Sequence, residues 1–305
     1  MNMSEFSFTR RGAILAAMAA GGCAATPSPA ALSDTALEGQ AIYSESVQMS
    51  GATPDGSVIF SIRLCQYPEA GVAWIWASLL TPDGSYVFAN NAIPWSGDPS
   101  FEAGANAATY AARYAGVDIR FQREGQHGKI TSGVLEFSRS GPEGFSVKAE
   151  FRPSSGFVGL LADRSEMFGH VTADVAAGGN TYALSGEGQW HEQPQTDPRF
   201  VIPFVYASLW GTAYSGTLLQ SPKGSGGYLL KAGASPTIFN TVEFAPISAD
   251  RLLKLGRADG PPIETRLELL HAYSLQIYGK TWHGTFVQGE LFGEHVVGFV
   301  NNWLM

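Results

Sequence analysis

Short runs of alternating apolar and polar residues, separated by turn-forming sequences, recur along most of this chain. Residues 116–123, 144–151 and 170–175 alternate in this way and are rich in β-branched and aromatic side chains. A period of two is typical of β-strands with one buried face and one face in water. The alanine-rich segment 102–113 is the one candidate for a short helix. The sequence therefore predicts a mostly β protein.

The composition agrees with a β-barrel or a β-sandwich. The chain has 305 residues, 36 of them glycine, with 12% aromatic and 45% hydrophobic residues. Charged residues make up 15%, against a usual value of about 25%. The length allows one large β domain or two small ones. A formal net charge of −8 without a visible basic cluster argues against nucleic acid as a partner.

The N-terminal residues have the features of an export signal. Arg10 and Arg11 precede the apolar run 13–20, which is shorter than the roughly 20 residues that a membrane span needs. Residues 1–22 resemble a twin-arginine signal, and an ordinary secretory signal with two arginines is the alternative. We therefore expect an exported protein of the periplasm or the cell envelope.

Cys23 follows three small residues that begin with Ala20, an order that resembles a bacterial lipobox. The resemblance implies cleavage before Cys23 and a lipid anchor on its thiol, although Leu is usual where Ala20 stands. Cleavage after Ala25, which would leave no anchor, is the alternative. Residues 23–37 then predict a tether. On either route Cys65 has no disulfide partner within the chain, and we expect it to be a buried core residue.

The most distinctive candidate site is the segment 185–193. On a strand, Glu187, Gln189 and His191 share one face, whereas Trp190 and Glu192 share the other. A polar face of this kind has no reason to line an apolar core without partners. It points either into a cavity, where it supplies an acid, a hydrogen-bond donor and a base, or into solvent.

A second segment, residues 279–284, also carries a glycine shortly before a Trp-His pair, here Trp282 and His283. The spacing of the histidines in the chain matches no short metal-binding motif, and we predict neither a metal nor a cofactor. Aromatic residues such as Tyr206 and Trp210 belong either to the core or to the wall of a ligand cavity.

In the order of four segments, this chain resembles one known family. The segments are residues 186–192, the proline-containing break at 193–198, residues 204–211 and the end at 284–303 with its spaced glycines. The family is the double-lipocalin family of carotenoid 1,2-hydratase (hydroxyneurosporene synthase) and the AttH-like proteins. The chain departs from the hydratase pattern at residues 192–194, where an Asn-Trp-Gly-like continuation would stand. The resemblance implies an all-β fold of two lipocalin-like antiparallel β-barrels packed side by side, residues 38–193 and 194–305, and a site for a hydrophobic, terpenoid- or carotenoid-like molecule.

Three functions follow from these features. The first is a cofactor-free hydratase, lyase or isomerase, in which a buried glutamic acid with a raised pKa protonates carbon beside an aromatic wall. The second is a non-catalytic envelope carrier of lipids or pigments. The third is a carbohydrate-binding or carbohydrate-active β-sandwich with paired carboxylates and exposed tryptophans. The predicted catalytic residues are Glu187, His191 and Glu192, and the predicted ligand-binding residues are Gln189, Trp190, Tyr206, Trp210, Trp282 and His283.

Overall fold

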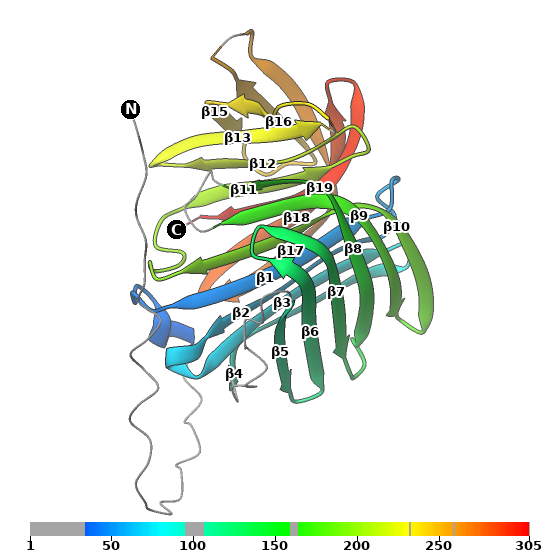
Figure 1. Cartoon of the computed structure of the whole chain (residues 1–305), viewed down its shortest axis with the longest axis vertical. Coiled ribbons are helices and arrows are strands. Elements are labelled where there is room, and N and C mark those ends of the chain that lie inside the picture. The colour runs from blue at the N-terminus through cyan, green and yellow to red at the C-terminus, as the bar shows by residue number, and fades with distance from the viewer. Residues whose placement is uncertain (1–33, 95–106, 159–163, 232, 259, 305) are drawn as a thin grey trace, which may run out of the picture. The chain divides into compact units, whose positions relative to one another are not determined.

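The computed structural model describes residues 34–94, 107–158, 164–231, 233–258 and 260–304 (Figure 1). Antiparallel strands dominate these ranges, with two 3₁₀ turns, η1 (Asp34–Leu37) and η2 (Pro68–Ala70). The all-β prediction is confirmed. The predicted signal, Cys23 and residues 23–33 of the predicted tether lie outside the described residues. Within the described ranges, no helix has the length and apolar character to cross a membrane.

The first sheet has ten strands and curls into a nearly closed barrel, called the first barrel below. Its spatial order is β4-β3-β2-β1-β10-β9-β8-β7-β6-β5, so that the first and last strands in sequence, β1 and β10, are neighbours. The strands are β1 (Ser44–Ala52), β2 (Ile59–Tyr67), β3 (Val72–Thr81), β4 (Gly84–Pro94), β5 (Ala107–Tyr114), β6 (Val117–Gln126), β7 (Lys129–Arg139), β8 (Phe145–Val158), β9 (Ser165–Ala177) and β10 (Asn180–Gln195).

The second sheet has nine strands in the order β14-β13-β12-β11-β19-β18-β17-β16-β15 and forms the second barrel. Here too the first and last strands, β11 and β19, pair with each other. The strands are β11 (Phe204–Trp210), β12 (Tyr214–Ser221), β13 (Gly224–Lys231), β14 (Thr237–Phe239), β15 (Thr241–Phe244), β16 (Asp250–Gly256), β17 (Ile263–Ile277), β18 (Lys280–Leu291) and β19 (Glu294–Trp303).

Each barrel has its own core because alternate side chains of every strand point inward. In β6, for example, Ile119 and Phe121 are buried and Arg120 is exposed, as the alternation predicts. Phe121, Phe137 and Trp190 belong to the core of the first barrel. Leu209, Phe239 and Leu255 belong to the core of the second barrel.

A third core lies between the two barrels, where their outer faces meet within the unit Ala31–Met305. Apolar side chains replace the polar ones expected on a solvated face. Trp76 of β3 contacts Trp282 of β18 with ring centroids 5.6 Å apart, and Phe168 of β9 contacts Tyr228 of β13 at 6.3 Å. The apolar side chains at the outward positions of these strands therefore explain why the two barrels pack side by side.

The segment predicted as a short helix is a strand where the structure describes it. β5 spans Ala107–Tyr114 and pairs with β6, with Tyr110 opposite Phe121. Burial of the Tyr110 ring against the first core and a full ladder of hydrogen bonds outweigh the modest helix propensity of alanine. Helix propensity is a weak guide where a neighbouring strand offers pairing.

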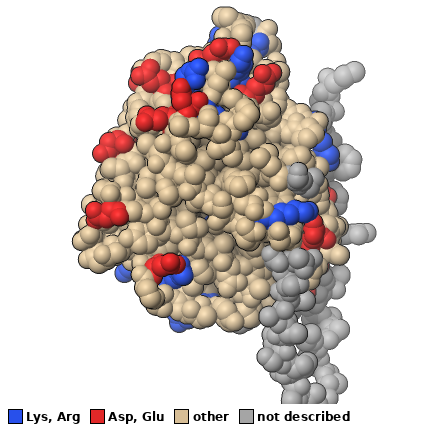
Figure 2. All heavy atoms as spheres, turned by 180° about the vertical axis from the view of Figure 1, so that it is seen from behind, with Lys and Arg blue, Asp and Glu red and all other residues tan. Residues whose placement is uncertain are grey.

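Figure 2 shows one face of the molecule, on which charged side chains of both signs gather over the second barrel. Two exposed cross-strand pairs belong to this barrel: Lys254 with Glu264 at 3.0 Å, and Arg266 with Asp250 at 2.9 Å. Exposed pairs like these contribute little to stability. They matter here as a contrast with the arginines buried between the barrels, described below.

Candidate functional site

A cavity of about 290 Å³ lies between the two barrels. This volume is at the low end of the range for pockets that hold small molecules. Its apolar and aromatic lining comes from Pro198, Phe200, Ile202, Phe204, Tyr206, Leu219 and Trp282. Its polar lining comes from Gln48, Arg63, Arg164, His191, Gln193, Gln195, Arg199, Ser221, Lys223 and Asn301.

The segment 196–203 connects the barrels and forms part of the cavity wall. Phe200 has a positive φ of 61°, a conformation that costs free energy in a residue with a side chain. Its ring packs against Trp282 with centroids 5.4 Å apart, and its carbonyl oxygen accepts a 2.9 Å hydrogen bond from Trp303 Nε1. These contacts hold the strained segment against the second barrel.

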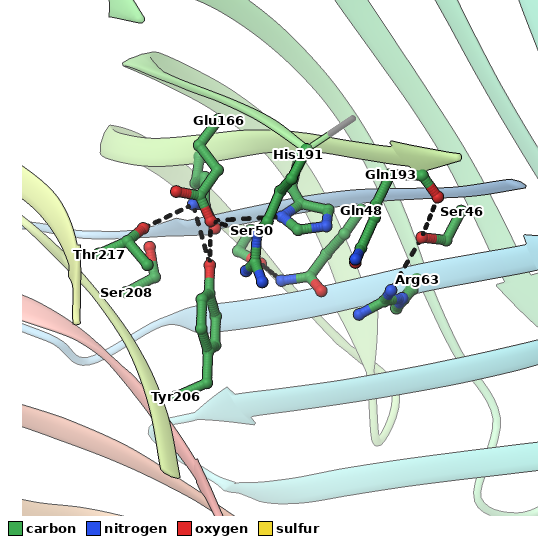
Figure 3. Close-up of polar contacts among 12 residues, drawn as sticks. Ser46, Gln48, Ser50, Arg63, Glu166, His191, Gln193, Tyr206, Ser208 and Thr217 are labelled. Atoms are coloured by element: carbon green, nitrogen blue, oxygen red, sulfur yellow. Dashed lines mark hydrogen bonds and ion pairs between the residues drawn. The ribbon is translucent and has the colours of Figure 1, made fainter. Parts of the chain in front are cut away.

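Glu166, on β9, is the centre of the polar network beside the cavity (Figure 3). It is 3% exposed. Arg164 lies two residues earlier on the same side of the chain, and its Nε is 2.8 Å from Glu166 Oε1. The same oxygen accepts a 2.8 Å hydrogen bond from the Tyr206 hydroxyl, and Oε2 accepts one from the Tyr228 hydroxyl.

The charge of Glu166 is set by two opposing effects. Burial alone would raise the pKa of the carboxyl group, but the Arg164 guanidinium, His191 and the Tyr228 hydroxyl hold it well below its usual range. Glu166 is therefore ionised at neutral pH. Its two tyrosine partners come from the second barrel, so the carboxylate also links the barrels.

His191 faces Glu166 across the pair of strands β10 and β9, where the two residues are direct register partners. Its Nδ1 is 3.6 Å from Glu166 Oε1. Its Nε2 is buried and has no hydrogen-bond partner among the described residues. Burial, followed by the charge of Arg164, lowers the pKa of His191 to about 3, so the ring is neutral at physiological pH.

Gln189 extends the network toward the second barrel. Its Nε2 donates to the Tyr206 hydroxyl at 3.3 Å and to Thr217 Oγ1 at 3.4 Å. Its Oε1 has no partner in the part of the chain that the structure describes. Burial and the nearby Glu166 raise the pKa of Tyr206 to about 12, which keeps the phenol protonated.

The predicted division of the 185–193 strand into two faces is seen in the structure. Gln189 and His191 point to the interface and take part in its network. Glu187 is on their side of the strand but lies away from the cavity lining, where its Oε1 is 3.5 Å from His170 Nδ1. The position of Glu187 thus separates it from the other two residues of its face.

Trp190 and Glu192 point into the first barrel. Glu192 Oε1 lies 2.7 Å from Arg123 Nε and accepts a 3.0 Å hydrogen bond from Trp190 Nε1. Its Oε2 is 2.8 Å from His127 Nδ1. The structure therefore places Glu187, His191 and Glu192, the predicted catalytic set, in three different surroundings.

The predicted aromatic ligand-binding residues are also divided. Tyr206 and Trp282 line the cavity. Trp210 is in the core between the barrels, where its Nε1 donates to Ser208 Oγ at 2.7 Å. His283 lies outside the cavity lining, with its Nδ1 3.3 Å from Ser274 Oγ.

Sequence reasoning overlooked Glu166, Arg164, Tyr228, Arg63 and Arg199. One signal was available for two of them: Arg164 and Glu166 are two residues apart at the start of a strand, which puts opposite charges on one face. Cys65 is buried, as predicted. Within the described ranges, no group of three or more His, Cys, Asp and Glu side chains is placed to hold a metal ion.

No protein-family model and no curated protein matches the sequence. Solved structures match the fold. CghA in complex with Sch210972 aligns with a TM-score of 0.62 at 12% identity, over 87% of this chain and 89% of CghA. CghA alone gives 0.61 at 12% identity over the same shares. An AttH-like protein of Nitrosomonas europaea gives 0.60 at 13% identity, over 86% of this chain and 92% of its own. The predicted resemblance to the double-lipocalin fold is thereby confirmed at the level of the fold.

Proposed function

We propose that this protein binds a hydrophobic small molecule in the cavity between its barrels and transfers a proton on that molecule through His191. The observation that carries the proposal is the surroundings of His191. The ring lines a largely apolar cavity, its Nδ1 is directed to the ionised Glu166, and its Nε2 lacks a partner among the described residues.

The pairing with Glu166 assigns the tautomer of His191. A carboxylate accepts hydrogen bonds, so we assign the imidazole proton to Nδ1 and the free electron pair to Nε2. A ligand in the cavity can supply the partner that Nε2 lacks. Glu166 is then a positioning residue that holds the ring and stabilises the imidazolium formed when Nε2 takes a proton.

The simplest balanced reaction is an isomerisation. A proton leaves one atom of the ligand for His191 Nε2 and returns to another atom of the same molecule, so no second reactant is needed. Addition or elimination of water uses the same proton transfer with one water molecule. Because Glu166 is ionised at neutral pH, we assign it no role as a proton donor in this reaction.

A non-catalytic carrier is the second candidate, and the aromatic wall of the cavity favours it. Phe200, Phe204 and Trp282 offer contacts that hold an apolar ligand without chemistry. A carbohydrate site receives less support, since each tryptophan that the structure describes is buried, including Trp74 and Trp303.

The test begins with the full chain incubated with a lipid extract of bacterial envelopes. Native mass spectrometry identifies bound molecules, and chromatography of the extract before and after incubation detects conversion. We expect binding by the wild type, by His191→Gln and by His170→Gln, a control for an exposed histidine outside the cavity. Conversion should fall by about 10²- to 10⁴-fold in His191→Gln and should not fall in His170→Gln.

Other outcomes separate the candidates. Binding without conversion by the wild type would favour the carrier. Equal conversion by His191→Gln would remove His191 from the mechanism. A wild-type protein that captures nothing from the extract, and that binds no member of a panel of polyenes, sterols and fatty acids, would contradict the proposed function.

A further inference from the structure

Two arginines in the cavity wall have no acidic partner among the described residues. Arg199 is 7% exposed, and Arg63 is half-buried with its Nε fully buried. Both line the cavity, and neither forms an ion pair with any residue in the described ranges. A buried charge is costly unless an opposite charge compensates it. Folding alone gives no reason to keep two of them side by side.

Neutral groups hold both guanidiniums in place. Arg63 Nη2 donates to Ser46 Oγ at 2.8 Å, and Ser46 Oγ donates to the Gln193 carbonyl oxygen at 3.4 Å (Figure 3). Arg199 Nη2 donates to the same carbonyl oxygen at 3.1 Å, and its Nε donates to Ser44 Oγ at 2.9 Å. The two positive charges therefore meet around one backbone carbonyl group.

The nearby charge of Arg199 affects the pKa of Arg63. Burial, followed by the charge of Arg199, lowers the pKa of Arg63 to about 10. Arg63 nevertheless remains charged at neutral pH. The hydroxyl and carbonyl groups orient the N–H donors of both arginines but do not neutralise the positive charges. This arrangement is typical of a site that binds an anion.

The remaining charges of the cavity point the same way. Arg164 and Lys223 also line it, and none of the described lining residues is Asp or Glu; Glu166 pairs with Arg164 from outside this lining. The chain as a whole carries a formal charge of −8. A local concentration of cations in an acidic protein is a feature of a binding site for anions.

We propose that the ligand of this cavity is an acidic amphiphile, whose oxyanion head binds Arg63 and Arg199 and whose apolar body lies along Phe204, Leu219 and Trp282. The inference rests on the proposed function in that it takes this cavity as the ligand site. Planar guanidinium groups match the paired oxygens of a carboxylate or a phosphate. A head of either kind supplies the charge that the arginines lack.

The test compares three probes that share one apolar chain: dodecanoate, dodecyl phosphate and dodecanol. Calorimetric titration of the full chain, below the aggregation concentration of each probe, gives the affinities. We expect at least one acidic probe to bind about tenfold or more tightly than dodecanol. The more tightly bound acid identifies the head group. Added salt should weaken binding of that acid and leave dodecanol unchanged.

Variants identify the residues responsible. Arg63→Gln and Arg199→Gln should each weaken the preferred acid by about 10- to 100-fold, with little change for dodecanol. Arg251→Gln is the matched control. Arg251 is a buried arginine without an ion pair in the described chain, it donates to Ala245 O and Asn302 Oδ1, and it lies outside the cavity lining. Its replacement should leave the preference for acids intact.

Two results would overturn the inference. Equal affinity of the wild type for dodecanol and both acids would remove the anion site but leave the proposed function standing. No binding of any of the three probes would also overturn the inference, whereas the proposed function falls only if the lipid extract and the panel of polyenes, sterols and fatty acids fail to bind as well. If a glutamine variant does not fold by circular dichroism, the salt dependence of the wild type and the Arg63→Lys and Arg199→Lys variants, which keep the charge, decide the question.

Discussion

Two buried glutamates of this protein have nearly the same chemical neighbours but different surroundings. Glu192, inside the first barrel, contacts an arginine, a histidine and a tryptophan. Glu166, between the barrels, contacts an arginine, a histidine and two tyrosines. Both oxygens of Glu192 have partners within 3.0 Å, and the residue lies apart from the interface cavity.

The surroundings of the two glutamates differ in the buried polar atoms that have no hydrogen-bond partner among the described residues. In the cavity lining, His191 Nε2 and Arg63 Nε are buried without hydrogen-bond partners in the described part of the chain, and so is Gln189 Oε1 in the adjoining network. A cluster of Glu, His and Arg is therefore not by itself a sign of function. Buried polar groups that are left unsatisfied at a cavity carry more information, because folding gains nothing from them.

Breaking the Glu192 cluster should have the largest effect on stability. Glu192→Gln removes the charge that compensates Arg123, which is 8% exposed. We expect the free energy of unfolding to fall by about 3–5 kcal/mol in urea titrations, with unchanged affinity of the folded protein for its ligand. The double variant with Arg123→Met should recover part of the loss. A loss of ligand affinity in folded Glu192→Gln would contradict the division between the two clusters.

The packing of the first barrel can be tested at Gly133. A Cβ atom at this position would lie 2.5 Å from the ring of Trp190. Gly133→Ala should therefore destabilise the protein by about 1–3 kcal/mol in thermal or urea unfolding, because the close-packed core has no room for a methyl group. Ser132→Ala, the adjacent position on the opposite side of β7, is the control. An unchanged stability would mean that the barrel interior has free space.

The buried neutral state of His191 predicts a pH dependence. Its pKa is lowered from 6.5 to about 3, so between these values the unfolded chain binds a proton that the folded chain does not. The contribution of His191 to stability is present above pH 6.5 and is lost as the pH falls. We expect a loss of about 1–2 kcal/mol between pH 6.5 and 5 from this residue. In His191→Gln the slope of stability against pH should be smaller, because unfolding then takes up as much as one proton fewer. Equal slopes in the wild type and the variant would mean that the ring is also charged in the folded protein.

The smallest effect is expected at Glu187. Its pair with His170 is partly exposed, and the two atoms are 3.5 Å apart. Glu187→Gln should change stability by less than about 0.5 kcal/mol and leave ligand conversion unchanged. A conversion rate reduced as strongly as in His191→Gln would instead restore Glu187 to the catalytic set predicted from the sequence.

Much of the fold could be predicted from local patterns. The alternation in residues 116–123 and 170–175 corresponds to β6 and β9, because period-two burial is a property of one strand and its immediate neighbours. In the segment 102–113, the part from residue 107 that the structure describes was misjudged, because the pairing of β5 with β6 is decided between strands. The resemblance to double-lipocalin proteins added what no local pattern contains, namely that two barrels pack together.

The site could be predicted only in part. The faces of β10 followed from spacing, which placed Gln189 and His191 together. The pairing of Glu166 with Arg164 could be read from their spacing, but its place at the centre of the network could not, because Tyr206 and Tyr228 bind it from 40 and 62 residues further along the chain. Nothing in the sequence says which outer face of a barrel meets another barrel. The role of Arg63 and Arg199 depends on the same long-range packing.

Photo-crosslinking tests the central claim, that the ligand lies between the barrels, most directly. The full chain would be irradiated with a fatty acid that carries a diazirine on its apolar chain, then digested and mapped by mass spectrometry. We predict labels on Ile202, Phe204, Leu219 or Trp282, which line the interface cavity, and loss of labelling in the presence of excess unlabelled acid. Labels concentrated on Phe121 and Phe151 in the first barrel, or on Leu253 and Leu255 in the second, would contradict it.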